Sequence, residues 1–156
     1  MQKFLETAQL EVGIAAVADF AAGDVFSDVI SLKNHGRVVF ITHWGVGATG
    51  VVKLTVQACD DVTPSNTSAV PFHYRINSGG THGAFTAATA ADGVSNAAAS
   101  NQIIACEIDA AALLAAGYGY ARLSVDETTD SPLLGGVLVL LLDPIHQRAT
   151  PLTALT

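Results

Sequence analysis

The chain carries little charge. Only 13% of its 156 residues are Asp, Glu, Lys or Arg, whereas 50% are hydrophobic, and a typical globular domain carries about 25% charged residues. Lys and Arg together number 7, no two of them are adjacent, and the net charge is −7. Because no basic patch could neutralise a run of phosphates, nucleic-acid binding is not expected. Small polar side chains or another protein chain must cover much of the surface.

Long apolar runs and cysteine clusters are also missing. The most hydrophobic stretch, residues 133–142, holds two glycines and is far shorter than the roughly 20 residues of a membrane-spanning helix. Cys59 and Cys106 are too few for a disulfide framework or a zinc site. Residues 1–6 lack the basic and apolar regions of a secretory signal. We therefore expect no membrane partner, free thiols and synthesis in a cytoplasm.

Short runs of aliphatic and β-branched residues, separated by turn residues, dominate the sequence. Residues 51–58 alternate most clearly, with Val52, Leu54 and Val56 on one face. Residues 137–142 are apolar on both faces, which predicts a central strand or one that a partner covers. The same criteria predict further strands at residues 25–32, 37–44, 70–76, 102–108 and 120–126, with a weaker one at residues 84–88.

About eight strands without a long amphipathic helix predict an all-β fold, an antiparallel β-sandwich with a jelly-roll-like topology. A short helical turn is expected at residues 110–116, after Asp109 and before Gly117. Most of residues 78–100 are predicted to be an exposed loop. The expected organisation is therefore an extended N-terminal arm at residues 1–20, a β-sandwich domain at residues 21–148 and a C-terminal tail at residues 149–156.

One glycine-rich segment matches a nucleotide-binding pattern. Residues 45–50 read Gly-Val-Gly-Ala-Thr-Gly and follow a predicted strand. In a dinucleotide site a helix must come next, because its N-terminus receives the pyrophosphate. Residues 51–56 are instead a β-branched run of period two, so a glycine-rich hairpin turn is the favoured interpretation.

Histidines and acidic pairs show no catalytic or metal-binding spacing. The five histidines are His35, His43, His73, His82 and His146, and none lies in a metal-ligand pattern. Two acidic pairs, at residues 60–61 and 126–127, lie at strand ends, where solvated carboxylates are the simplest interpretation. An enzyme would require at least two of His43, His73, Asp60, Asp61 and Asp126 to meet in one pocket. We expect no enzyme, and assign no catalytic, cofactor-binding or metal-binding residue.

Three segments of the chain resemble a known family. They are Asp19-Phe20 to Gly23 with the following run at 27–34, Ala69-Val70-Pro71-Phe72-His73-Tyr74-Arg75, and residues 101–110 with 117–123. The final residues 149–154 fit as well. In these segments the chain is similar to small structural proteins encoded beside the major capsid gene of tailed bacteriophages.

The resemblance implies a head decoration, or cement, protein on the outside of the capsid. Such proteins are β-rich and often trimeric, and they bridge capsid subunits without catalysis. The implied partners are the major capsid protein and further copies of this chain, in a virion assembled in the host cytoplasm. The low charge agrees with a surface that is largely interface.

The residues expected at that interface lie in the N-terminal arm. Phe4, Leu5, Leu10 and Val12 are the apolar side chains assigned to contacts with neighbouring subunits. An alternative is a phage tail or host-recognition component whose β-sandwich binds glycans through exposed loops and aromatic rings. Trp44 is the lone tryptophan that could serve such a site, although a single Trp is more often part of a core or interface.

Overall fold

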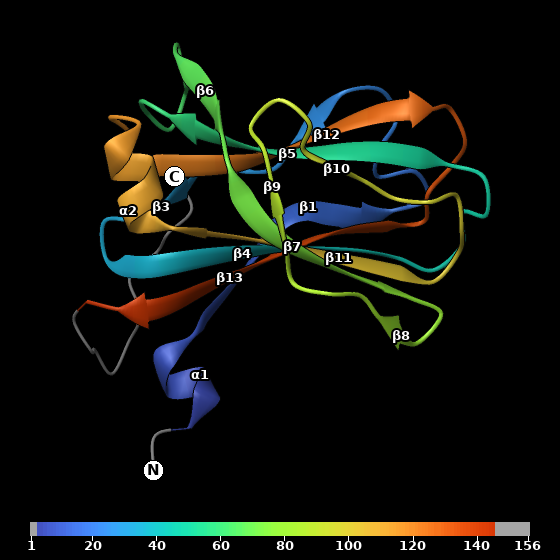
Figure 1. Ribbon diagram of the computed structural model, residues 1–156, viewed down its shortest axis with the longest axis horizontal. Coiled ribbons are helices and arrows are strands. Elements are labelled where there is room, and N and C mark those ends of the chain that lie inside the picture. Colours follow the sequence, from blue (N-terminus) through green and yellow to red (C-terminus); the bar gives the residue numbers. More distant parts are fainter. Residues whose placement is uncertain (1–2, 146–156) are drawn as a thin grey trace.

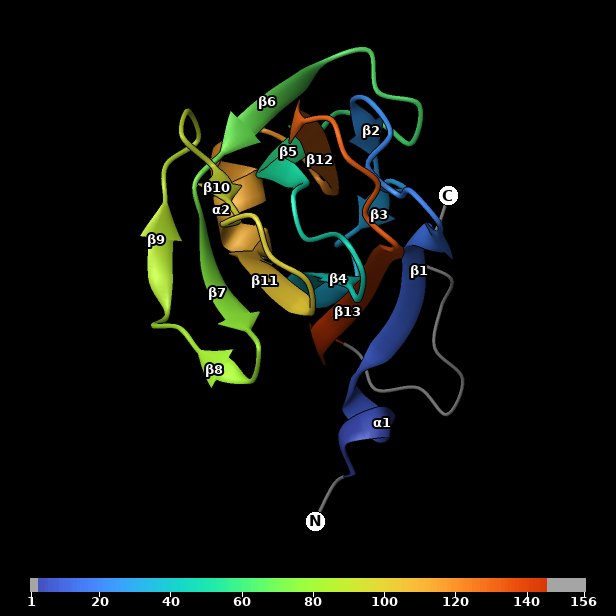
Figure 2. The ribbon, with the colours of Figure 1, turned by 90° about the vertical axis from the view of Figure 1, so that its right-hand side faces the viewer.

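Two antiparallel sheets face each other in a computed structural model that describes residues 3–145 (Figures 1 and 2). The first sheet has the order β1-β13-β4-β11-β7-β8, with β9 paired to β7. Its strands are β1 (Gln9–Val17), β4 (His35–Trp44), β7 (Phe72–Ser78), β8 (Thr81–His82), β9 (Thr86–Ala88), β11 (Gln102–Asp109) and β13 (Gly135–Pro144).

The second sheet has the order β10-β5-β12-β2, with β3 paired to β12 and β6 paired to β5. Its strands are β2 (Val25–Phe26), β3 (Ile30–Ser31), β5 (Val51–Cys59), β6 (Thr67–Val70), β10 (Val94–Ser95) and β12 (Tyr120–Thr129). Two short helices, α1 (Phe4–Thr7) and α2 (Ala110–Ala115), complete the described part of the chain. Neither of these helices has the length and hydropathy needed to cross a bilayer.

The predicted all-β sandwich is therefore confirmed. Its long strands form three nested pairs along the chain, β4 with β13, β5 with β12 and β7 with β11. Nested antiparallel pairing of this kind is the winding expected of a jelly-roll-like chain. Strand β4 joins two of these pairs, since it bonds to β11 as well as to β13.

The core lies between the sheets and is built by alternation. In β5 the side chains of Val52, Leu54 and Val56 are fully buried, as their spacing predicted. From the first sheet, Phe40 and Trp44 of β4 point into the same core. Their neighbours along β4 face outward because successive side chains in a strand point to opposite sides of the sheet.

Part of the expected N-terminal arm belongs to the sandwich. Residues 9–17 form β1, which pairs with β13 at the edge of the first sheet. Phe20 follows and is buried against Trp44, with ring centroids 6.2 Å apart. The sheet therefore begins at Gln9, ahead of the expected boundary at residue 21. The expected C-terminal tail, residues 149–156, lies outside the described residues.

Two predicted strands are each divided in the structure. Residues 25–32 form β2 and β3, because the segment between them turns toward the other sheet, where the Asp28 amide donates to the Gly13 carbonyl at 2.9 Å. Residues 70–76 are divided at Pro71, with β6 in the second sheet and β7 in the first. Proline has no amide hydrogen for a ladder, which explains the break at this residue.

The helical turn occurs where the sequence predicts it. Helix α2 follows Asp109 and ends before Gly117, whose φ of +84° is a conformation that glycine adopts readily. The Asp109 carboxylate makes no capping hydrogen bond. The predicted loop at residues 78–100 is more ordered than expected, since it contains β8, β9 and β10 and buries Val94 in the core.

Candidate interaction surface on the outer face of the first sheet

Apolar side chains face solvent where β1 lies beside β13. Leu10 is opposite Leu140, and Val12 is opposite Leu138. Leu10, Val12 and Leu138 are 53%, 51% and 48% exposed, whereas Val139, on the other face of β13, is fully buried. The sequence of residues 137–142 is apolar on both faces. In β13 one row of these side chains therefore packs in the core, and the other row faces outward.

Helix α1 adds two further apolar side chains beside this face. Phe4 and Leu5 are 57% and 69% exposed, and α1 contacts β13. Its first turn is held by the Glu6 carboxylate, which accepts a hydrogen bond of 3.0 Å from the Lys3 amide. In Figure 1, α1 lies on the side of the first sheet that faces away from the second sheet. We define the outer apolar surface as Phe4, Leu5, Leu10, Val12, Leu138 and Leu140.

All four residues expected at an interface belong to this surface. Phe4, Leu5, Leu10 and Val12 are exposed, and the pairing of β1 with β13 sets the last two beside Leu138 and Leu140. The sequence did not assign those two leucines to the interface. Their signal was the alternation of leucine in a strand that is apolar on both faces.

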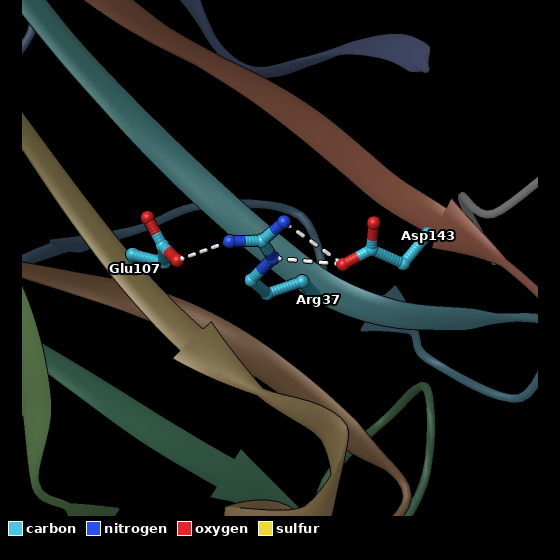
Figure 3. A network of polar contacts seen from close by, with 3 residues as sticks. All are labelled: Arg37, Glu107 and Asp143. Carbon is cyan, nitrogen blue, oxygen red and sulfur yellow. Dashed lines mark hydrogen bonds and ion pairs between the residues drawn. The ribbon is translucent and has the colours of Figure 1, made fainter. Parts of the chain in front are cut away.

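A charged cluster borders the outer apolar surface. Arg37 of β4 reaches across to both neighbouring strands, with Nη1 2.9 Å from Glu107 Oε1 and Nη2 2.9 Å from Asp143 Oδ2 (Figure 3). Arg37 Nε also donates to Asp143 at 2.9 Å. The hydrogen bond to Glu107, followed in size of effect by the one to Asp143, raises the pKa of Arg37. The cluster joins β11, β4 and β13 at one end of the sheet and gives the surface a polar boundary.

The histidines are dispersed. His35 is buried, and desolvation lowers its pKa, which favours the neutral ring. His43 and His73 face outward on β4 and β7, with β11 between them, and His82 lies on β8. His146 is outside the described residues. Within residues 3–145 no three His, Cys, Asp or Glu side chains gather in a way that could hold a metal ion.

The acidic pairs organise loops. The Asp60 carboxylate accepts hydrogen bonds from the Ser65 hydroxyl at 2.8 Å and from the Asn66 amide at 3.1 Å. The Asn66 side-chain amide donates to the same carboxylate at 3.0 Å, and the hydrogen bonds from Ser65 and then from Asn66 lower the pKa of Asp60 to about 2. Glu127 accepts from the amides of Gly23 and Ser131. Both carboxylates thus close turns between strands, as groups that satisfy backbone donors commonly do.

The glycine-rich segment is not the hairpin turn that the sequence suggested. It joins β4 in the first sheet to β5 in the second, so it crosses between the sheets. Leu133 packs beneath it and is fully buried, and a Cβ at Gly47 would lie 2.3 Å from Leu133 Cδ2. A strand follows rather than a helix, so the segment lacks the helix N-terminus that a pyrophosphate site requires.

The cysteines and the tryptophan are core residues. Cys59 and Cys106 are buried, and burial raises the pKa of both thiols. Trp44 is fully buried, and its indole Nε1 donates to the Ala99 carbonyl at 3.0 Å. Its ring is therefore closed off from the solvent and cannot stack on a sugar.

Comparison with known proteins gives a structural likeness but no match in sequence. No family model matches the chain, and no curated protein matches it. Among solved structures, the chain is similar to the SPBc2 prophage-derived protein YomS, with a TM-score of 0.42 and 14% sequence identity. The alignment covers 87% of this chain and 93% of that one.

Proposed function

We propose that this protein is a non-enzymatic structural component of a tailed-phage virion that decorates and stabilises the outside of the capsid. The observation that carries the proposal is the outer apolar surface on β1, β13 and α1. Through it the protein would bind the major capsid protein and bridge neighbouring capsid subunits. The sequence resemblance to head decoration proteins supplies the identity of that partner.

The physical support comes from the apolar side chains that the outer apolar surface leaves in contact with water. Leu10, Val12 and Leu138 are each about half exposed and adjacent across two paired strands. Exposed apolar side chains scattered singly are ordinary, whereas a contiguous group on a regular sheet face is typical of a protein contact. A partner that removes this group from water gains about 25 cal/mol for each Å² of apolar area buried.

The low charge of the chain supports the same proposal. Interface cores are depleted of charged residues, and only 13% of this chain is charged. Charged groups lie beside the apolar side chains of this surface, Lys3 and Glu6 at α1 and the Arg37 cluster at the end of the sheet. Such an arrangement favours a contact with an apolar centre and a polar rim. Self-association, most simply as a trimer, is part of the proposal and would leave each subunit able to contact the shell.

The test is the solution mass of the purified protein by light scattering, followed by co-sedimentation with expanded empty capsids of the parent phage. The proposal predicts a stable oligomer that pellets with the capsids in proportion to added protein, up to a fixed occupancy. A monomer that stays in the supernatant at every ratio would contradict it. Unexpanded shells serve as the matched control, because the resemblance to head decoration proteins implies attachment to the outside of the expanded capsid.

A further inference from the structure

A cavity of about 400 Å³ opens at the far edge of the first sheet, where β7, β9, β11 and α2 meet. Its apolar floor is formed by Phe72, Ala88 and Ile108, which are 3%, 6% and 3% exposed. Sites for small molecules commonly have volumes of about 300–1,000 Å³ and mostly apolar walls. This cavity has both properties, and β13 and β4 lie between β1 and the cavity strand β11.

Phe85 lines the cavity and remains exposed. Its side chain is 55% exposed, whereas Val94, the other sizeable apolar residue of the 78–100 segment, is 5% exposed and belongs to the core. The Phe85 ring stacks on His73, with centroids 4.8 Å apart and planes only 6° from parallel. Folding therefore fixes the orientation of this ring without burying it.

The loop that carries Phe85 is held in place by a close backbone approach. The Gly83 amide donates to the Ile76 carbonyl of β7 at 2.7 Å. A Cβ at position 83 would lie 2.9 Å from that same oxygen, so glycine permits the contact. The aromatic ring is thus presented on a segment tied to the sheet.

The polar side chains that line the cavity are the carboxylates of Glu107 and Asp109 and the imidazole of His73, which stacks on Phe85. Glu107 and Asp109 are two residues apart on β11 and share a face of that strand. Arg37 engages Glu107, whereas the Asp109 carboxylate has no hydrogen-bond partner within residues 3–145. An ionised carboxylate only accepts hydrogen bonds, so a ligand must bring the donors.

We propose that this cavity binds a neutral saccharide. A pyranose ring has an apolar face of C–H groups that can pack on Phe85 and the buried floor, while its hydroxyl groups donate to Asp109 and Glu107. Asp109 disfavours anionic sugars by charge repulsion, since within residues 3–145 no cation pairs with it as Arg37 pairs with Glu107. Glu107 also belongs to the Arg37 cluster that borders the outer apolar surface. Phe85, Asp109 and the buried floor lie outside that surface, so sugar binding can be tested separately from capsid decoration.

The test is a nuclear magnetic resonance titration of the full chain with methyl β-D-glucopyranoside, methyl β-D-galactopyranoside and N-acetylglucosamine. At least one of these neutral sugars should give saturable shifts in the backbone amides of Phe85, Ala88 and Asp109. Glucuronate is the charged comparison and should bind at least about tenfold more weakly than that sugar. Absence of saturable shifts with all three neutral sugars, or shifts confined to other strands, would overturn the proposal.

Two variants and a matched control sharpen the assignment. Phe85→Ala should weaken sugar binding at least about tenfold. Asp109→Asn removes a negative charge and keeps a side chain suited to the start of α2. This second variant should reduce the difference in affinity between neutral and anionic sugars. Phe26→Ala is the control, because Phe26 is 47% exposed on the other sheet, beneath Arg122. Equal binding by wild type and Phe85→Ala, or an equal loss in Phe26→Ala, would overturn the site.

Discussion

Val12 of β1 lies directly opposite Leu138 of β13, and each side chain leaves about half of its surface in water, 51% and 48%. A strand pair normally buries one face and gives polar residues to the other. Here the solvent-facing side of the pair is apolar as well. This relationship is the basis of the outer apolar surface and of the predictions that concern it.

Removal of residues 1–7 should weaken capsid attachment and leave the fold intact. The truncation deletes Phe4 and Leu5 but retains Ala8, which is buried, and Gln9, where β1 begins. Circular dichroism should show an unchanged β spectrum with a small change in melting temperature, while co-sedimentation with expanded capsids falls. Full occupancy by the truncated protein would exclude α1 from the interface.

Replacement of Arg37 by Met should destabilise the fold modestly. The substitution removes both ion pairs and leaves Glu107 and Asp143 without their cation. Because these side chains are 30–61% exposed, the expected loss in the free energy of unfolding is only about 1 kcal/mol. Urea denaturation should show this difference at low salt and a smaller one at 1 M salt, since salt screens exposed pairs. An equal loss in the free energy of unfolding at both salt concentrations would contradict an electrostatic origin of the effect of Arg37→Met.

Stability should fall in acid partly through Asp60. Hydrogen bonds from Ser65 and Asn66 lower its folded-state pKa from 3.8 to about 2. A carboxyl with a depressed pKa stabilises the fold above its unfolded pKa, and this contribution is lost as pH falls through the folded pKa. The loss should therefore occur between about pH 4 and pH 2. Asp60→Asn should be less stable than wild type at neutral pH and should lose less stability than wild type between about pH 4 and pH 2. Urea denaturation at each pH measures both effects. Equal losses of stability with falling pH in the two proteins would contradict the role of Asp60.

Gly47→Ala should destabilise the sandwich by about 1–3 kcal/mol. The added Cβ would lie 2.3 Å from Leu133 Cδ2, and the φ of Gly47 is +150°. Gly45→Ala is the matched control in the same crossover, because its Cβ would have Asn101 Oδ1 as its nearest neighbour, at 3.9 Å. Urea denaturation should separate the two variants clearly. Similar stabilities would show that Leu133 moves aside without loss.

Alternation in the sequence predicted most of the long strands because their buried faces follow a strict period of two. Residues 51–58 and 102–108 correspond to β5 and β11 with small changes at the ends. The stop of α2 before Gly117 was also placed correctly, whereas the break at Pro71 was missed, since residues 70–76 were expected to form one strand. These features depend on local residues, which a sequence displays directly.

Contacts between distant segments could not be predicted in this way. Asn96 lies in a stretch of small polar residues, yet its side chain is buried, accepts from the Val52 amide at 2.8 Å and donates to the Gly50 carbonyl at 3.1 Å. Residues 1–20 were expected to be an extended arm, yet residues 9–17 form β1 at the edge of the first sheet. Which strand β1 joins depends on long-range pairing, and the same holds for the meeting of Phe85 with His73.

The most direct measurement of the central claim is the capsid occupancy of the double variant Leu10→Thr/Val12→Thr. Threonine keeps β-strand propensity while removing apolar contact area, so the variant should fold and bind expanded capsids at least about tenfold more weakly than wild type. Leu114→Ala is the control, because Leu114 is 70% exposed on α2, away from the outer apolar surface, and its occupancy should be unchanged. Wild-type occupancy by the folded double variant would contradict the assignment of this surface to the capsid.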